Sequence, residues 1–339
     1  MRSPTDLLYR SGLLVEFLRS KETDIGYLLF AIFYTADSKY IERILADLSG
    51  RADLPNGWRQ RVLLLLSAHY LTEHKYRSAI EAFNSINIDY YNETNDQFKG
   101  FFDSTLRFIE TILVARAWEQ PSNLSARKFF FIGDSHALGV TSFIKDNSVV
   151  YLPGLRLSYL ASPQPNAIKV GFQNAINRAY SERYVLISIG EIDSREVYSK
   201  LINDSEWWKF SRQKWMVAIS KAIKFIADLR HPLQDIFLIV PPPPSEFILH
   251  ANLEGLSVDI DQRRALFKQV VQVNSEFRDI FTENAAAHDL CTICYTSVIA
   301  KKSEFVMAEN LVDHAHFKQT IYQDLIYFWT SEYCKNYSI

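Results

Sequence analysis

Apolar positions recur with two different periods along this chain. Within residues 7–119 they are spaced three and four apart, which is typical of amphipathic helices. Breaks rich in Gly, Pro, Ser and Asn, as at 48–50 and 55–57, separate the helical stretches. The first part is therefore predicted to be an all-α domain of helical hairpins over residues 1–122, ending in a polar linker around 120–123.

One stretch of this helical part, residues 63–86, resembles a single unit of the tetratricopeptide type. Tyr70, Tyr76, Ala79 and Phe83 stand where that repeat places large, large, small and large residues. No second copy follows at a period of about 34 residues. The helical domain is interpreted either as a packing module or as a platform for a protein partner.

Beyond the linker, short and continuously apolar runs alternate with helical stretches. Strands are predicted at 129–133, 149–152, 184–189, 235–240 and 290–295, and helices near 136–146, 165–181, 207–230, 259–287 and 317–334. This alternation is typical of a parallel sheet covered by helices on both faces. Ligands of such sheets bind at the carboxyl ends of the strands. The residues that follow each strand are therefore the candidates for chemistry.

Composition narrows the class of protein. A chain of 339 residues exceeds most single cores, in agreement with two domains. Lys and Arg (37) nearly balance Asp and Glu (39), and no basic tract suggests nucleic-acid binding. No run reaches the ~18 apolar residues of a membrane span, and the N-terminus lacks the features of a signal peptide. These observations predict a cytoplasmic protein.

Only three cysteines are present, too few for a disulfide framework. Cys291 and Cys294 form a lone C-x-x-C motif with no second pair. We interpret them as two small buried thiols rather than as a zinc or redox site.

Three reactive side chains follow the first predicted strand. The segment FFFIGDSHALG (129–139) places Asp134, Ser135 and His136 where a strand gives way to a helix. A serine there can attack a carbonyl, and its own N–H can hold the resulting oxyanion. The alternative is an ordinary helix cap, because Asp and Ser are common capping residues.

A second polar motif, Asp313-His314-Ala315-His316, precedes the last predicted helix. In this D-x-x-H spacing Asp313 can fix the tautomer of His316 while the other ring nitrogen faces a serine. His314 is interpreted as a solvated loop residue. The combination with a serine at a strand end favours a Ser-His-Asp triad.

Gly133-Asp134-Ser135, together with Asp313 and His316, resembles the SGNH/GDSL hydrolase superfamily over residues 127–335. The resemblance implies that residues 127–339 form a flavodoxin-like three-layer α/β/α sandwich. It also implies an acyl-transfer mechanism in which Ser135 is the nucleophile, His316 the general base and Asp313 the residue that orients the base.

The family's second block is a glycine after the second strand, and Gly154 matches it. The resemblance implies that its N–H completes an oxyanion hole with the N–H of Ser135. No cofactor is expected, and no metal is expected because the His, Asp and Glu residues show no ligand spacing beyond the triad pair.

The third block departs from the family. G-x-N-D is expected, but the chain reads G-E-I-D at 190–193, so Ile192 stands where an asparagine would donate to the oxyanion. Loss of one such donor lowers the rate by about 10²–10³. Arg195 can replace the donor or hold an anionic group; the alternative is a salt bridge to Glu191 or Asp193. The residues predicted to line the substrate pocket are Asp134, His136, Glu191 and Asp193.

The sequence thus predicts serine-dependent acyl-ester chemistry on a small or carbohydrate substrate, by hydrolysis or by O-acyl transfer. Tyr198, Trp207 and Trp208 either stack on sugar rings or pack in the core. The long connection at 242–260 is typical of a lid or a substrate loop. A different class stays open: an SGNH-fold binding or scaffold protein that has lost the asparagine and contacts a partner through its helical domain.

Overall fold

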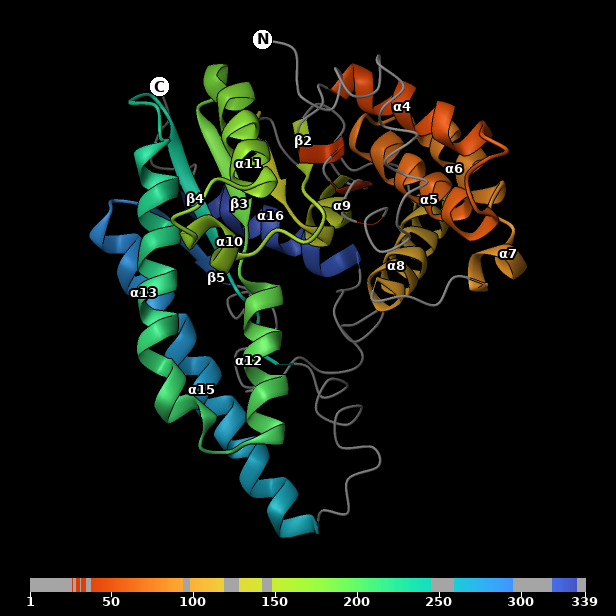
Figure 1. Ribbon diagram of the computed structural model, residues 1–339. Coiled ribbons are helices and arrows are strands. Elements are labelled where there is room, and N and C mark those ends of the chain that lie inside the picture. Colours follow the sequence, from red (N-terminus) through yellow and green to blue (C-terminus); the bar gives the residue numbers. More distant parts are fainter. Residues whose placement is uncertain are drawn as a thin grey trace.

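A parallel sheet with helices on both faces forms the centre of the molecule (Figure 1). The computed structural model describes residues 26, 29–30, 32–34, 38–93, 98–118, 128–141, 148–244, 259–294 and 319–333. The predicted catalytic motif at 313–316 and most of the predicted lid lie outside these residues. Of the described helices, none is both long and apolar enough to span a bilayer.

The sheet has five strands in the order β2-β1-β3-β4-β5, and every neighbouring pair is parallel. The strands are β1 (Phe130–Gly133), β2 (Ser148–Tyr151), β3 (Tyr184–Ser188), β4 (Asp235–Val240) and β5 (Cys291–Cys294). This is the flavodoxin-like order, so the predicted three-layer sandwich is confirmed. The order changes direction between β1 and β3, and a crevice is expected outside the carboxyl ends of these two strands.

Alternation of side chains along each strand builds two separate cores. Phe130 and Ile132 of β1 face a cluster formed with the helices of one layer, whereas Phe131 faces the other layer. The first layer contains α10 (Leu157–Ala161), α11 (Ala167–Arg178), α13 (Trp207–Asp228) and α15 (Ile260–Ala287), and the second contains α9 (Ser135–Thr141) and α16 (Gln319–Tyr333). The central strands β1, β3 and β4 are therefore buried on both faces.

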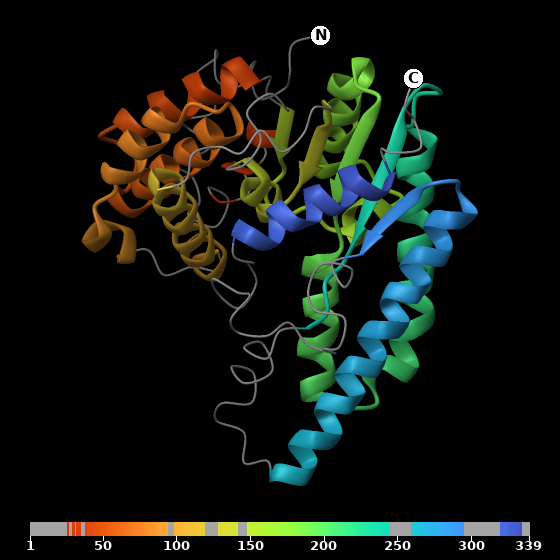
Figure 2. The same cartoon turned by 180° about the vertical axis from the view of Figure 1, so that it is seen from behind.

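The N-terminal part is helical, as predicted. It contains α4 (Ser38–Gly50), α5 (Asn56–Thr72), α6 (Tyr76–Asn84), α7 (Ile88–Asn92) and α8 (Lys99–Trp118). One continuous hydrophobic cluster joins Trp58 and Phe102 of these helices to Phe131, Tyr151 and Tyr322 of the sandwich. The helices accordingly lie against α9 and β2 in both views (Figures 1 and 2). The division into separate domains at residues 122 and 127 stays a prediction.

The carboxyl edge of the sheet carries a helical projection that the sequence pattern did not predict. Helix α12 (Glu191–Asn203) leaves the end of β3 and extends beyond the sheet beside α13 and α15 (Figures 1 and 2). Trp208 Nε1 donates a hydrogen bond of 2.7 Å to Glu276, and the rings of Trp215 and Phe277 lie 5.9 Å apart. These contacts hold α13 and α15 together below the sheet.

The predicted burial of the two β5 cysteines is wrong. Cys291 is exposed and Cys294 is only partly buried. The reason is position: β5 pairs with β4 alone and forms an edge of the sheet. An apolar run in the sequence does not distinguish an edge strand from a central one.

Candidate functional site

The carboxyl ends of β1 and β3 approach closely where the candidate site begins. Gly133 pairs with Ser188 in the sheet, and a Cβ on Gly133 would lie 3.0 Å from the Ser188 Cβ and 3.2 Å from its carbonyl oxygen. A larger residue would push the two strands apart at this point. Glycine therefore sets the narrow junction from which the next three residues emerge.

The Asp134-Ser135-His136 turn is held by Asp134 itself. Its carboxylate Oδ1 accepts the His136 N–H at 3.1 Å, and its carbonyl accepts the Ala137 N–H at 2.9 Å. Asp134 and His136 are each 1% exposed, whereas Ser135 is only partly buried. Asp134 thus caps the start of α9, and of these three residues only Ser135 is partly exposed.

Behind the turn, buried polar groups from three helices meet. His136 Nδ1 lies 2.8 Å from the Tyr322 hydroxyl of α16, and His136 Nε2 lies 3.8 Å from Glu191 Oε2 of α12. Glu191 Oε1 in turn lies 2.6 Å from Arg195 Nε. We call the buried residues Asp134, His136, Glu191 and Tyr322, together with the partly exposed Arg195, the buried polar cluster.

Acidic and basic side chains face one another in this cluster. The pKa of Asp134 is raised to about 6, mainly by burial; the nearby Glu191 carboxylate contributes to the rise, and His136 opposes it. Burial alone would lower the pKa of His136, but Asp134 and Glu191 outweigh it and raise the pKa above its usual value. The His136 imidazole and the Arg195 guanidinium therefore face two carboxylates, those of Asp134 and Glu191, and opposite charges favour the charged form of the imidazole.

The cluster also has the residue types of a metal site. Ligand atoms of Asp134, His136 and Glu191 all lie within 4.8 Å of one another. However, the Arg195 guanidinium already contacts one oxygen of Glu191, and the raised pKa of His136 opposes its use as a neutral ligand. The residues fit an ion-pair network better than a metal centre.

Sequence reasoning left the partner of Arg195 open, and the structure gives Glu191. The two residues are four apart on α12, where positions i and i+4 share a face, whereas Asp193 is two apart and points elsewhere. Asp193 is fully buried, and its carboxylate accepts the N–H groups of Leu157 at 2.8 Å and Ser158 at 3.2 Å. It therefore holds the start of α10 rather than lining an open pocket.

Gly154 lies in the loop between β2 and α10 with a left-handed φ of 71°. A Cβ there would meet nothing within 4 Å, so backbone conformation and not crowding favours glycine. The Leu152 N–H donates to the Gly133 carbonyl at 2.7 Å, which ties this loop to the turn after β1. Gly154 and Ser135 thus belong to neighbouring loops at one edge of the sheet.

Tyr322 is the member of the cluster that the sequence reasoning missed. The local pattern QTIYQDLI of α16 does not distinguish it from other apolar-face aromatics. One indirect signal existed: Gly139 follows His136 by three residues on α9, and a Cβ there would lie 2.5 Å from the Tyr322 ring. A glycine in a buried helix indicates the close approach of another group.

Other predicted residues are placed as follows. Asp313, His314 and His316 lie outside the described residues, so their distance to Ser135 stays a prediction. Tyr198 and Trp208 belong to the core under α12, α13 and α15, which agrees with packing and not with sugar stacking.

No protein-family model matches the chain, and no curated protein matches it. Among solved structures, a carbohydrate acetylesterase from Sinorhizobium meliloti is 11% identical, with a TM-score of 0.38 over 62% of this chain and 100% of that one. An aryl esterase from M. smegmatis is 13% identical, with a TM-score of 0.38 over 62% of this chain and 99% of that one. Similarity at this level carries no functional argument. The functional argument comes from the strand order and from the chemistry of the site.

Proposed function

We propose that this chain is an SGNH-type serine hydrolase of acyl esters. The observation that carries the proposal is the accessibility of Ser135 between two buried neighbours, in the turn that ends β1 at the switch point of the sheet. A helix cap alone does not explain this arrangement, because the Asp134 carboxylate already bonds the backbone of the turn.

In the proposed mechanism Ser135 Oγ attacks the ester carbonyl while His316 accepts its proton. Asp313 orients His316 and stabilises the imidazolium. The tetrahedral intermediate collapses, and His316 returns the proton to the leaving alcohol. Water then attacks the acyl-enzyme with His316 again as base, and the acid is released.

The oxyanion is held by the N–H groups of Ser135 and Gly154, with Arg195 in place of the donor that Ile192 lacks. Arg195 suits this role because Glu191 anchors its Nε while the side chain stays 28% exposed. A guanidinium has five N–H donors, so an anchored Nε leaves further donors for a ligand. The proposed substrates are small or carbohydrate esters, and an alcohol in place of water would make the same site an O-acyltransferase.

Labelling with a fluorophosphonate probe tests the nucleophile. The wild-type protein is expected to be labelled and to hydrolyse p-nitrophenyl acetate, and Ser135→Ala is expected to lose both. Ser148→Ala is a matched control, because Ser148 is an exposed serine at the opposite end of the neighbouring strand. A folded wild-type protein that stays unlabelled would instead support the scaffold interpretation, which Ile192 favours.

The roles of Arg195 and His316 have their own tests. Arg195→Ala is expected to lower kcat by about 10²-fold. Because Arg195→Ala removes the ion-pair partner of the buried Glu191 carboxylate, the double variant Arg195→Ala/Glu191→Gln is measured beside it. The single and the double variant should lower kcat by the same factor. His316→Ala should lower kcat far more than His314→Ala; the reverse ranking would identify His314 as the base.

A further inference from the structure

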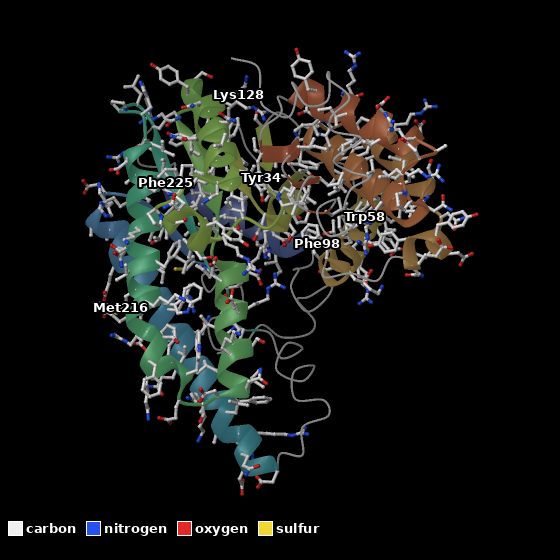
Figure 3. The ribbon with its side chains drawn as sticks, viewed as in Figure 1. Tyr34, Trp58, Phe98, Lys128, Met216 and Phe225 are labelled. Atoms are coloured by element: carbon white, nitrogen blue, oxygen red, sulfur yellow. The ribbon has the colours of Figure 1, made fainter. Side chains whose placement is uncertain are left out.

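The N-terminal helical part reaches the proposed oxyanion loop through one side chain. Tyr34 lies outside the sandwich in sequence, yet it is 3% exposed and its hydroxyl donates a hydrogen bond to the Pro153 carbonyl. Figure 3 labels Tyr34 where the N-terminal helices meet the sheet. The bond therefore connects a residue 119 positions upstream to the residue just before Gly154.

Peptide geometry turns this contact into a constraint on Gly154. The carbonyl of Pro153 and the N–H of Gly154 belong to the same planar trans peptide, in which the two groups point in opposite directions. A donor that fixes the carbonyl also fixes the direction of the N–H. Without it, Gly154 can readily adopt other backbone angles, because it lacks a Cβ and is not crowded.

Tyr34 is itself rigidly placed. A Cβ on Gly171 of α11 would lie 2.6 Å from the Tyr34 ring and 2.7 Å from its Cα, so α11 packs directly on this residue. Its neighbour Phe33 meets Tyr151 of β2 at 5.5 Å between ring centroids. Burial raises the pKa of the Tyr34 phenol well above its usual value, so it stays a donor at physiological pH.

Further hydrogen bonds hold the loop between β2 and α10 on both sides of Gly154. Asp193 binds the Leu157 and Ser158 N–H groups, and the Leu152 N–H binds the Gly133 carbonyl. These bonds place the backbone on either side of Gly154. Tyr34 supplies the hydrogen bond to the peptide that carries the Gly154 N–H.

We propose that Tyr34 is a positioning residue that orients the Gly154 N–H toward the oxyanion, so that the N-terminal helical part completes the active site. The inference rests on the proposed function, because it assigns the Gly154 N–H a role in acyl transfer. The N-terminal helical part would then contribute to catalysis as well as to packing.

Tyr34→Phe tests the inference because it keeps the buried ring and removes only the hydroxyl. With p-nitrophenyl acetate we expect kcat to fall on the order of 10-fold at unchanged KM, less than the 10²–10³ for a donor removed outright. The rate of fluorophosphonate labelling should fall in parallel. Tyr76→Phe is the matched control: its hydroxyl, also from the helical part, donates to the carbonyl of Thr141 at the end of α9. It should keep kcat within twofold.

A second variant changes the other residue of the Pro153–Gly154 peptide. Gly154→Ala introduces no clash but disfavours the left-handed φ, and should lower kcat at unchanged KM. Because both changes release one peptide, Tyr34→Phe/Gly154→Ala should be no slower than the slower single variant. Circular dichroism and thermal unfolding confirm that each variant is folded at the assay temperature.

The outcomes separate the inference from the proposed function. If the wild-type protein hydrolyses the ester and Tyr34→Phe keeps kcat within twofold, or Tyr76→Phe loses as much, the positioning role is refuted and the serine mechanism stands. If Tyr34→Phe raises KM at unchanged kcat, the residue acts on substrate binding and the inference is wrong. If the wild-type protein is neither labelled nor active, the proposed function fails and the inference falls with it.

Discussion

Replacing Gly139 by alanine is expected to disturb the buried polar cluster through the Tyr322 ring. The added Cβ would lie 2.5 Å from Cε2 and 2.7 Å from Cδ2 and Cζ of that ring, whereas ordinary contacts begin at 3.4 Å. The ring, which is fully buried, would have to move by about 0.9 Å. A shift of this size would stretch the 2.8 Å contact with His136 beyond hydrogen-bond range.

The expected loss of stability follows from these two effects. Overpacking a core typically destabilises by about 1–3 kcal/mol, and a lost buried hydrogen bond adds about 1 kcal/mol. At roughly 2 °C per kcal/mol for a chain of this size, Tm should fall by about 4–8 °C. The measurement is thermal unfolding followed by circular dichroism, with fluorophosphonate labelling as the functional readout.

Two variants make this test specific. Gly100→Ala is the matched control, since Gly100 lies on α8 with nothing within 4 Å of an added Cβ, and alanine there should be neutral or stabilise by up to about 1 kcal/mol. In a Tyr322→Leu background, where no ring faces Gly139, most of the penalty should disappear. An equal penalty in both backgrounds, or a Gly139→Ala protein as stable as the wild type, would refute the packing argument.

Three further predictions concern charge, capping and domain organisation. Because folding raises the pKa of His136, this residue stabilises the protein below about pH 6.5, and the stabilisation is lost as the pH rises through the folded-state pKa. The Tm difference between the wild type and His136→Gln should therefore shrink from pH 6.5 to 9. A difference that grows over this range would contradict the prediction. Asp193→Ala removes the acceptor of two amides at α10 and should destabilise by about 0.5–2 kcal/mol in urea unfolding; an unchanged midpoint would exclude the capping role. A fragment of residues 127–339 should aggregate or bind a hydrophobic dye, because the helical part covers one apolar face of the sandwich. A soluble fragment with the same Tm as the full chain would instead show that the two parts are independent domains.

Part of the site could be predicted because it is local. The turn after β1 is built from adjacent residues. Gly133 allows β1 and β3 to approach closely, Asp134 caps the start of α9, and Ser135 is partly exposed. The pairing of Arg195 was left open because α12 was not predicted. Its sequence EIDSREVYSKLIN is mostly polar, and once it is a helix the i,i+4 spacing selects Glu191.

The sequence alone determined the order and kind of the main elements, because helical and strand periods follow from backbone geometry within a few residues. It also placed Asp134, Ser135 and His136 directly after the first strand. Tertiary structure decided what each buried face meets. The bond from Tyr34 to Pro153 and the contact of Tyr322 with His136 join residues 119 and 186 positions apart. An apolar pattern requires that such residues be buried but carries no information about the partner, since hydrophobic burial is non-directional.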